Sequence, residues 1–399
     1  MALKNNTRFR RLGVMYLLLY FGEGLVAIYL FNAIRAAGLT TMNSALVFIA
    51  TYLPSLLLSR LLATYMTRLG SARVLRISAI CRTAACVGFA LIPHGASLLY
   101  AIGFVVVIEA MWFFMMPAVD TIQEATLARE DLSSGESVLT VVLQISLFSS
   151  LFLGGIIADQ VGVAALLLIA GALQTGIAAL ASTGSPAGAA PAADTPATDT
   201  DRSRVRVPVP LFVALSLVLA LPQLLNILLP LKAFSTYDGS TTLGIIDSMY
   251  NLGALVSGLC GAWLLAKVVS PSRAGLIAVL LAVASGTLWV FSASTQVLTD
   301  VLAYFVLGLT VSVVRILLRT TVFELAPTGD SGPYFTALTR YSLATSLAGS
   351  LLVGAVGNRY DWHIAYIVLP LMCLLSIGLV LSRRKYFAVP PESAEESKV

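Results

Sequence analysis

The sequence has 399 residues, of which 58% are hydrophobic and only 11% are charged, and its mean hydropathy is +0.89. This balance excludes an ordinary water-soluble domain and indicates a protein that crosses a membrane many times. The net charge of +5 requires no nucleic-acid partner, because the basic residues fall mainly in the loops between apolar segments.

Apolar segments of about 20 residues, the length that crosses a bilayer, recur along nearly the whole chain. These runs do not alternate apolar and polar residues as barrel strands do, so each is predicted to be a helix. We therefore expect an all-α integral membrane protein with twelve transmembrane helices in two sets of six. The first set is residues 13–34, 44–66, 74–93, 97–119, 138–157 and 162–181, and the second is 209–233, 243–266, 274–293, 299–320, 335–357 and 363–382.

The basic residues predict the orientation of the helices. The chain starts with a basic segment that leads into a run long enough to span, so the first helix is expected to stay rather than to be cleaved as a signal peptide. With the N-terminus inside, only Arg35, Lys232 and Arg359 fall in loops on the outer side. The positive-inside rule then places both termini in the cytoplasm, for a protein of the inner membrane.

A polar segment divides the chain near its midpoint. Residues 182–207 are rich in Ala, Pro, Thr and Asp and have no apolar periodicity, so they are predicted to be a disordered cytoplasmic linker. The linker separates an N-terminal bundle, residues 1–181, from a C-terminal bundle, residues 208–385. Residues 386–399 are left as a cytoplasmic tail.

A short match links the two halves. "GGIIADQVG", which begins at Gly154, aligns with "VGAVGNRYD", which begins at Val353, and this pairs Asp159 with Asn358. Each segment ends the fifth helix of its half, which indicates an internal structural repeat. Two six-helix halves, a long linker and this motif resemble the major facilitator superfamily. The resemblance implies a secondary transporter that works by alternating access.

Other motifs refine the resemblance. "FFMMPAVDTIQEATLAREDLSSGESVL", residues 113–139, is similar to the branch that holds macrolide-efflux and catecholate-siderophore export proteins. "ATYMTRLGSAR" is similar to the family's loop between the second and third helices, which implies that Arg68 and Gly70 form a conformational loop. Thr67 replaces the Asp of that loop, and Val105 stands where drug antiporters have an Arg, which weakens a standard multidrug assignment.

Ionisable side chains within the spans suggest function, because each costs about 2.5–3.5 kcal/mol to insert. Glu23 lies mid-way along the first helix between two glycines that would let a backbone or ligand come close, and Glu109 lies mid-way along the fourth. Both are predicted to couple protons to transport, since a carboxylate at the midplane can take up and release a proton. A nearby cation such as Arg315 would favour the ionised form of Glu23. The alternative is a structural acid, neutral or paired with an arginine, that fixes helix packing. Arg60 and Arg82 could instead pair with lipid phosphate or a helix carbonyl.

The resemblance also implies that the first, fourth, seventh and tenth helices line a central cavity. Polar and aromatic side chains on these helices, with one arginine on the eleventh, are predicted to bind substrate. They are Tyr16, Tyr20, Phe113, Met116, Gln223, Asn226, Tyr304, Ser312, Arg315 and Arg340.

The sequence contains no nucleotide-binding loop and no metal-site spacing of its cysteines, so neither a cofactor nor a metal is expected, and the chain is not predicted to be an enzyme. Intramembrane arginines outnumber the mid-span acids, which favours an anionic substrate. The expected function is proton-coupled export of a small metabolite such as a carboxylate-type siderophore by a monomer in contact with membrane lipids. Broad multidrug efflux, organic-anion import and a non-transporting membrane sensor remain as alternatives.

Overall fold

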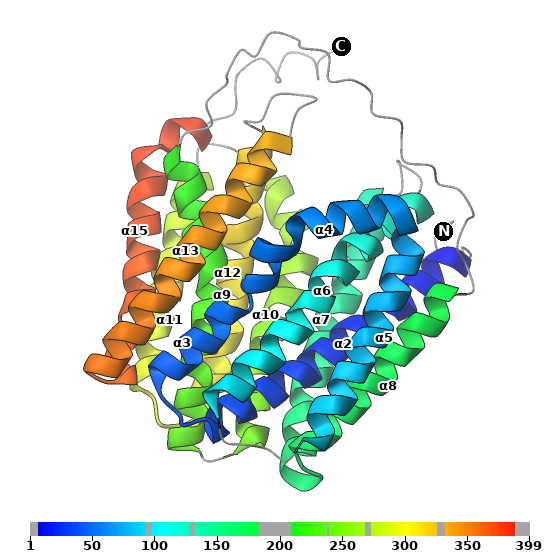
Figure 1. The fold of residues 1–399 in the computed structure, drawn as a ribbon. Coiled ribbons are helices and arrows are strands. Elements are labelled where there is room, and N and C mark those ends of the chain that lie inside the picture. The colour runs from blue at the N-terminus through cyan, green and yellow to red at the C-terminus, as the bar shows by residue number, and fades with distance from the viewer. Residues whose placement is uncertain are drawn as a thin grey trace, which may run out of the picture. The chain divides into compact units, whose positions relative to one another are not determined.

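The computed structural model describes residues 7–92, 97–127, 132–182, 209–237, 239–267, 273–324 and 332–387, and within these ranges every regular element is helical (Figure 1). The first half of the chain forms α2 (Thr7–Ala36), α3 (Thr41–Ala50), α4 (Leu53–Leu69), α5 (Ser71–Leu91), α6 (Leu98–Thr126), α7 (Leu132–Gln160) and α8 (Val163–Ser182). The second half forms α9 (Val209–Thr236), α10 (Ser240–Lys267), α11 (Arg273–Ala293), α12 (Val297–Glu324), α13 (Gly332–Arg359), α14 (Trp362–Ala365), α15 (Val368–Ser382) and η3 (Arg384–Phe387). The predicted linker and tail lie outside the described residues, except for Ser182 and residues 386–387.

The all-α membrane fold is confirmed. Among the described residues, 10 helices are long and apolar enough to cross a membrane, and they coincide with ten of the expected spans. The other two expected spans, 243–266 and 335–357, fall within α10 and α13, which have 28 residues each.

One expected helix is interrupted. The span predicted at residues 44–66 is divided into α3 and α4 by a turn at Thr51 and Tyr52. Pro54 lies at the start of α4, where its missing N–H costs no helical hydrogen bond. The Thr51 hydroxyl donates to the carbonyl of Phe48 at 2.7 Å, which satisfies an acceptor at the end of α3. A hydropathy run does not reveal this break, because the residues around it stay apolar.

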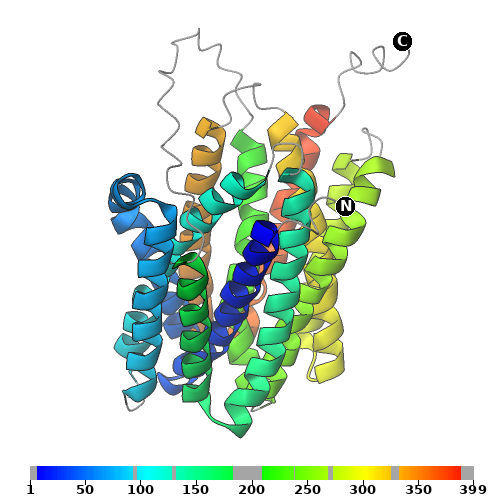
Figure 2. The ribbon, with the colours of Figure 1, turned by 90° about the vertical axis from the view of Figure 1, so that its right-hand side faces the viewer.

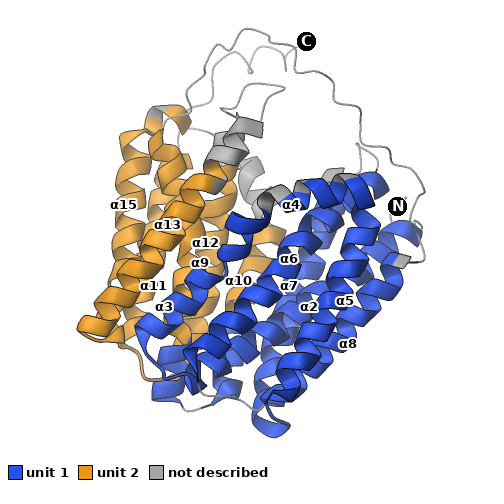
Figure 3. Ribbon diagram, in the orientation of Figure 1, with its two compact units in different colours: residues 1–203, 230–248 blue, residues 204–229, 249–399 orange. Residues whose placement is uncertain are grey.

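The chain forms two compact units (Figure 3). Unit 1 comprises residues 1–203 with 230–248, and unit 2 comprises residues 204–229 with 249–399, so that α9 and α10 each contribute to both. In unit 1, α2 packs against α7 and α8, and α5 packs against α6 and α8 (Figure 2). In unit 2, α11 packs against α12 and α15. The third predicted helix of each half therefore packs on the fourth and sixth, as expected of a repeat.

Matching aromatic contacts strengthen the comparison between the units. In unit 1, the rings of Phe89 and Phe104 join α5 to α6, with their centroids 5.1 Å apart. In unit 2, the rings of Phe291 and Tyr304 join α11 to α12, with their centroids 4.7 Å apart. The two pairs occupy corresponding helices, so an aromatic pair fills the same helix crossing in both units.

Glycines allow two helices of unit 2 to touch along their backbones. A Cβ atom at Gly308 of α12 would lie 2.0 Å from the carbonyl oxygen of Tyr250, and one at Gly253 of α10 would lie 2.1 Å from the carbonyl oxygen of Phe305. Small residues at such crossings are the usual way in which membrane helices gain close packing. Neither position has room for a side chain.

We therefore expect Gly308→Ala to destabilise the protein. The added methyl must push α10 and α12 apart, and overpacking of this kind costs about 1–3 kcal/mol. Thermal unfolding of the purified protein in detergent measures the effect as a lower midpoint. Gly286→Ala on α11 is the matched control, since nothing lies within 4 Å of the added Cβ there. Equal midpoints for the two variants would contradict the packing argument.

Candidate functional site

A buried ion pair lies within unit 1. Arg82 of α5 donates a hydrogen bond from Nη2 to Oε2 of Glu23 on α2, and the two groups form a salt bridge. The Arg82 side chain is 0% exposed, whereas that of Glu23 is 23% exposed. Nε and Nη1 of Arg82 donate no hydrogen bond to any described residue. The guanidinium therefore keeps two nitrogens whose N–H groups Glu23 does not bind.

Helix α6 supplies the remaining neighbours of this arginine. The Arg82 guanidinium carbon lies 5.0 Å from the ring centroid of Trp112, a separation typical of a cation–π contact. Glu109 lies nearly one turn before Trp112 and interacts electrostatically with both Glu23 and Arg82. Glu23, Arg82, Glu109 and Trp112 are called the charge cluster below. It contains two acids and one permanent cation.

The glycines that flank Glu23 serve helix packing. A Cβ atom at Gly24 would lie 1.9 Å from Oγ of Ser150 on α7, and one at Gly22 would lie 3.2 Å from Nε2 of Gln174 on α8. Both glycines thus let α2 approach its neighbours closely. This contact fixes the helix that carries Glu23, so the acid has a defined position beside Arg82.

An aromatic cluster continues from the charge cluster along α2 and α6. The Tyr20 ring packs against Trp112 and Tyr16, with centroid separations of 5.6 and 5.7 Å. The Tyr20 hydroxyl donates to Sδ of Met116 at 3.7 Å, and the Tyr16 hydroxyl donates to Oε1 of Gln123 at 2.6 Å. Three residues predicted to bind substrate, Tyr16, Tyr20 and Met116, therefore join the predicted proton-coupling acids in one region.

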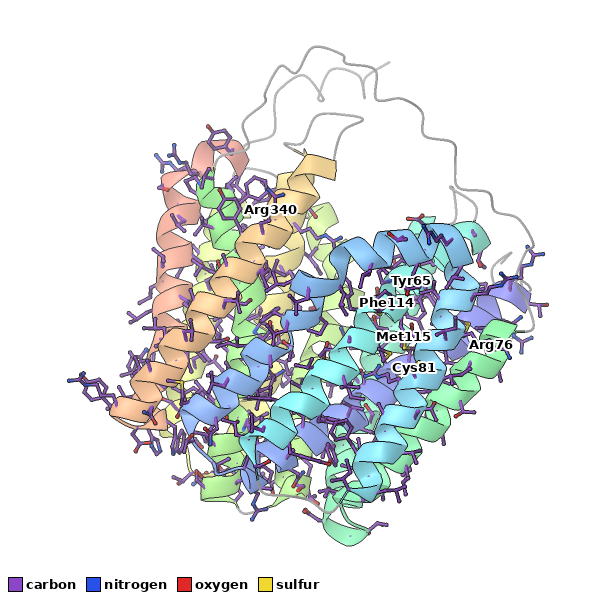
Figure 4. The ribbon with its side chains drawn as sticks, in the orientation of Figure 1. Tyr65, Arg76, Cys81, Phe114, Met115 and Arg340 are labelled. Carbon is purple, nitrogen blue, oxygen red and sulfur yellow. The ribbon has the colours of Figure 1, made fainter. Side chains whose placement is uncertain are left out.

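Phe113 belongs to a different contact on the same helix. Its ring packs on Phe114 at 5.9 Å, and Phe114 in turn meets Tyr65 of α4 edge-on at 6.2 Å (Figure 4). The pair joins α6 to α4 rather than to the charge cluster. Three residues after Tyr65 on α4, Arg68 is exposed, and Gly70 connects α4 to α5 with a φ of +77° that favours glycine.

The other predicted substrate-binding residues lie in unit 2. Gln223 and Asn226 are half-buried on α9, and Ser312 is buried on α12. Tyr304 is buried on α12, with its ring 4.7 Å from that of Phe291. Arg315 on α12 is exposed. Arg340 on α13 is also exposed (Figure 4). These six residues of unit 2 are thus spread over three helices, and they form no salt bridge with one another.

Two expectations about arginines require correction. Arg82 binds neither lipid phosphate nor a helix carbonyl as its partner, because Glu23 accepts its hydrogen bond. The cation beside Glu23 is accordingly Arg82 rather than Arg315. The signal in the sequence was the insertion cost of Arg82 in the middle of an apolar helix, which favours a polar partner within the protein. The side chain of Arg60 lies outside the described part of the chain.

Comparison with known proteins gives the family. The family described as Major Facilitator Superfamily matches residues 12–351, which is most of the chain. The chain belongs to the major facilitator superfamily. Its membership identifies a multi-pass membrane transporter rather than an enzyme. Among curated proteins, none matches the sequence.

Solved structures of transporters share the fold. The nucleoside transporter NupG, in the structure of a single-residue mutant, is 13% identical with a TM-score of 0.75, over 96% of this chain and 100% of that chain. A POT family transporter in complex with a thioalcohol-conjugated peptide is 12% identical with a TM-score of 0.69, over 94% of this chain and 96% of that chain. At these identities the likeness establishes the fold of this superfamily member and leaves its substrate open. It gives no support to the macrolide and siderophore branch.

The ion pair generates a stability prediction. Removing one partner of a buried pair costs about 3–5 kcal/mol, because the other charge is left without compensation. We expect Arg82→Gln to lower the thermal midpoint strongly and the double variant Glu23→Gln with Arg82→Gln to recover part of the loss. Arg76→Gln, at an exposed position on the same helix, is the control. A double variant no more stable than Arg82→Gln would show that charge compensation is not what Arg82 provides.

Proposed function

We propose that this chain is a proton-coupled secondary transporter in which Glu23 and Glu109 carry the coupling protons and Arg82 is their shared counter-ion. The observation that supports the proposal is that two acids, from α2 and α6, interact with one buried arginine from α5. Transport in the cytoplasmic membrane with both termini inside follows from the charge distribution of the loops.

The charge balance explains why protons would be carried here. Arginine stays protonated in proteins, so the charge of the cluster can change only at its carboxylates. One cation compensates one carboxylate, and a second ionised carboxylate in a medium of low dielectric constant is costly. The cluster therefore favours holding one proton on its acids. When Arg82 moves from Glu23 towards Glu109, Glu23 becomes the acid that takes the proton.

The aromatic residues indicate what kind of solute the site accepts. Tyr16 and Tyr20 continue from Trp112 of the charge cluster, and the three residues combine ring faces with hydroxyl groups, which suits a small amphiphilic molecule. Export of an anionic solute, such as a carboxylate-type siderophore, rests on the arginine count and on the resemblance of residues 113–139. Because Glu23 already neutralises Arg82, the charge cluster adds little to that preference.

Proton coupling predicts a specific loss in two variants. Purified protein in liposomes that contain a pH-sensitive dye is exposed to a panel of nucleosides, dipeptides, carboxylate siderophores and cationic dyes. A transported solute changes the internal pH with wild-type protein, and we expect Glu109→Gln and Glu23→Gln to reduce this change at least tenfold. Glu124→Gln, at an exposed position on α6, should keep it.

Retention of the pH change by both Gln variants would refute the coupling role of the charge cluster. If no solute in the panel moves protons with wild-type protein, and none moves without a proton gradient either, the non-transporting sensor becomes the better interpretation. Uptake of an anion against its gradient would instead identify an importer, and proton exchange with several unrelated cationic dyes would identify multidrug efflux.

The substrate proposal has its own test. We expect the culture medium of a deletion strain to lack one secreted chelator under iron starvation, and to match the parent when iron is plentiful, because a siderophore is needed only without iron. Metabolite comparison of the two media by mass spectrometry measures this. Accumulation of the same compound inside the cells would support export. Identical media in both conditions would exclude the siderophore.

A further inference from the structure

The carboxylate of Asp159 holds the first turn of another helix. Asp159 lies at the end of α7, and its Oδ1 accepts the N–H of Ser240 at 3.1 Å while its Oδ2 accepts the N–H of Thr241 at 2.7 Å. These are the first two residues of α10, whose leading N–H groups have no acceptor within their own helix. A helix is normally capped by a sequence neighbour. Here the capping acid comes from 81 positions earlier in the chain.

The backbones of the two helices are in contact beside this carboxylate. A Cβ atom at Gly155 would lie 2.4 Å from the carbonyl oxygen of Ser240, and one at Gly244 would lie 2.4 Å from the carbonyl oxygen of Leu151. The Thr241 hydroxyl also donates to the carbonyl of Gly155 at 3.4 Å. At these two glycines the end of α7 and the start of α10 therefore meet backbone to backbone.

A third helix joins the same point. The Ser240 hydroxyl donates to Oδ1 of Asn32 on α2 at 2.9 Å, and Nδ2 of Asn32 donates to the carbonyl of Ile28 in its own helix at 2.9 Å. The amide of Asn32 is thus oriented by α2 and presented to α10. Ser240 is bound through its N–H to α7 and through its side chain to α2.

We propose that Asp159 is a conformational latch that fixes the first turn of α10 on α7 in one state of the transport cycle. Residues 240–248 of α10 belong to unit 1, whereas the rest of the helix belongs to unit 2. Any displacement of this turn from α7 breaks both hydrogen bonds of Asp159 at once and separates two backbones that fit closely. The contact therefore has two discrete states, made or broken, as a latch requires. The inference rests on the secondary transport proposed above.

Hydrogen–deuterium exchange on the full-length protein tests whether Asp159 holds the turn. We expect Asp159→Ala to raise exchange in peptides covering residues 239–248 about tenfold, since two hydrogen bonds to helix N–H groups are lost. Asp159→Asn, which keeps one acceptor oxygen, should give a smaller rise. The matched control is Asp361→Ala, because Asp361 caps only its own helix, α14, through the N–H of His363. Unchanged exchange at 239–248 would overturn the proposal.

A distance measurement separates a latch from a mere cap. In a variant whose native cysteines are replaced, spin labels at Val161→Cys, which follows α7, and Ser235→Cys, near the end of α9, report on both sides of the contact within unit 1. Both positions are exposed. We expect pulsed spin-resonance spectra to show an additional, longer distance in Asp159→Ala. A single unchanged distance would show that Asp159 only caps α10, and would overturn the latch.

These two measurements use neither a substrate nor a proton gradient. The latch can therefore fail while Glu109→Gln still abolishes the substrate-driven pH change, and the reverse can also occur. If the latch is confirmed but Glu109→Gln keeps the pH change, Asp159 is still a latch. The conformational change that it controls is then not coupled to protons through the charge cluster.

Discussion

A charge inside the hydrocarbon layer must be compensated within the protein, and in unit 1 this requirement is met by the pairing of Glu23 with Arg82. Helices α2 and α5, which carry the two residues, each pack on α8. The long side chain of Arg82 reaches from α5 to the acid on α2 and so bridges two neighbours of a shared helix. Neither charge is tolerable there without the other, so the pair fixes how these helices are rotated about their axes.

The same pair restricts what the region can do chemically. Arg82 cannot release its proton, so it serves as a constant positive charge whose partner can change. The ring face of Trp112 stabilises the Arg82 guanidinium without accepting a directed hydrogen bond. The Nε and Nη1 nitrogens of Arg82 donate to no described residue. In the proposed transport cycle this arginine turns from one acid to the other. Glu109, on the helix that carries Trp112, is the second acid within its electrostatic reach.

Much of this arrangement could be predicted from the sequence, because it depends on local pattern. Long apolar runs predicted the helices, and the insertion cost of a carboxylate inside such a run marked Glu23 and Glu109 as candidate functional residues. The sequence does not show which residues on different helices contact each other in the fold. Helical periodicity shows which residues share a face but not which helix that face meets, so the sequence alone does not pair Arg82 with Glu23. The break after α3 was also missed, because apolar residues continue through it.

The capping of α10 by Asp159 could not be predicted from the sequence either. The acid and the N–H groups that it binds are far apart in the chain, and every residue other than proline has such an N–H group. Yet α2 connects this contact to the charge cluster, because Glu23 and Asn32 lie on one continuous helix, about 14 Å apart along its axis. A helix transmits a rotation or tilt along its length as a rigid element. In the proposed cycle, exchange of Arg82 between the acids releases α2 from α5. The bond between Asn32 and Ser240 would carry that movement to the latch, which links protonation to the start of α10 through a single helix.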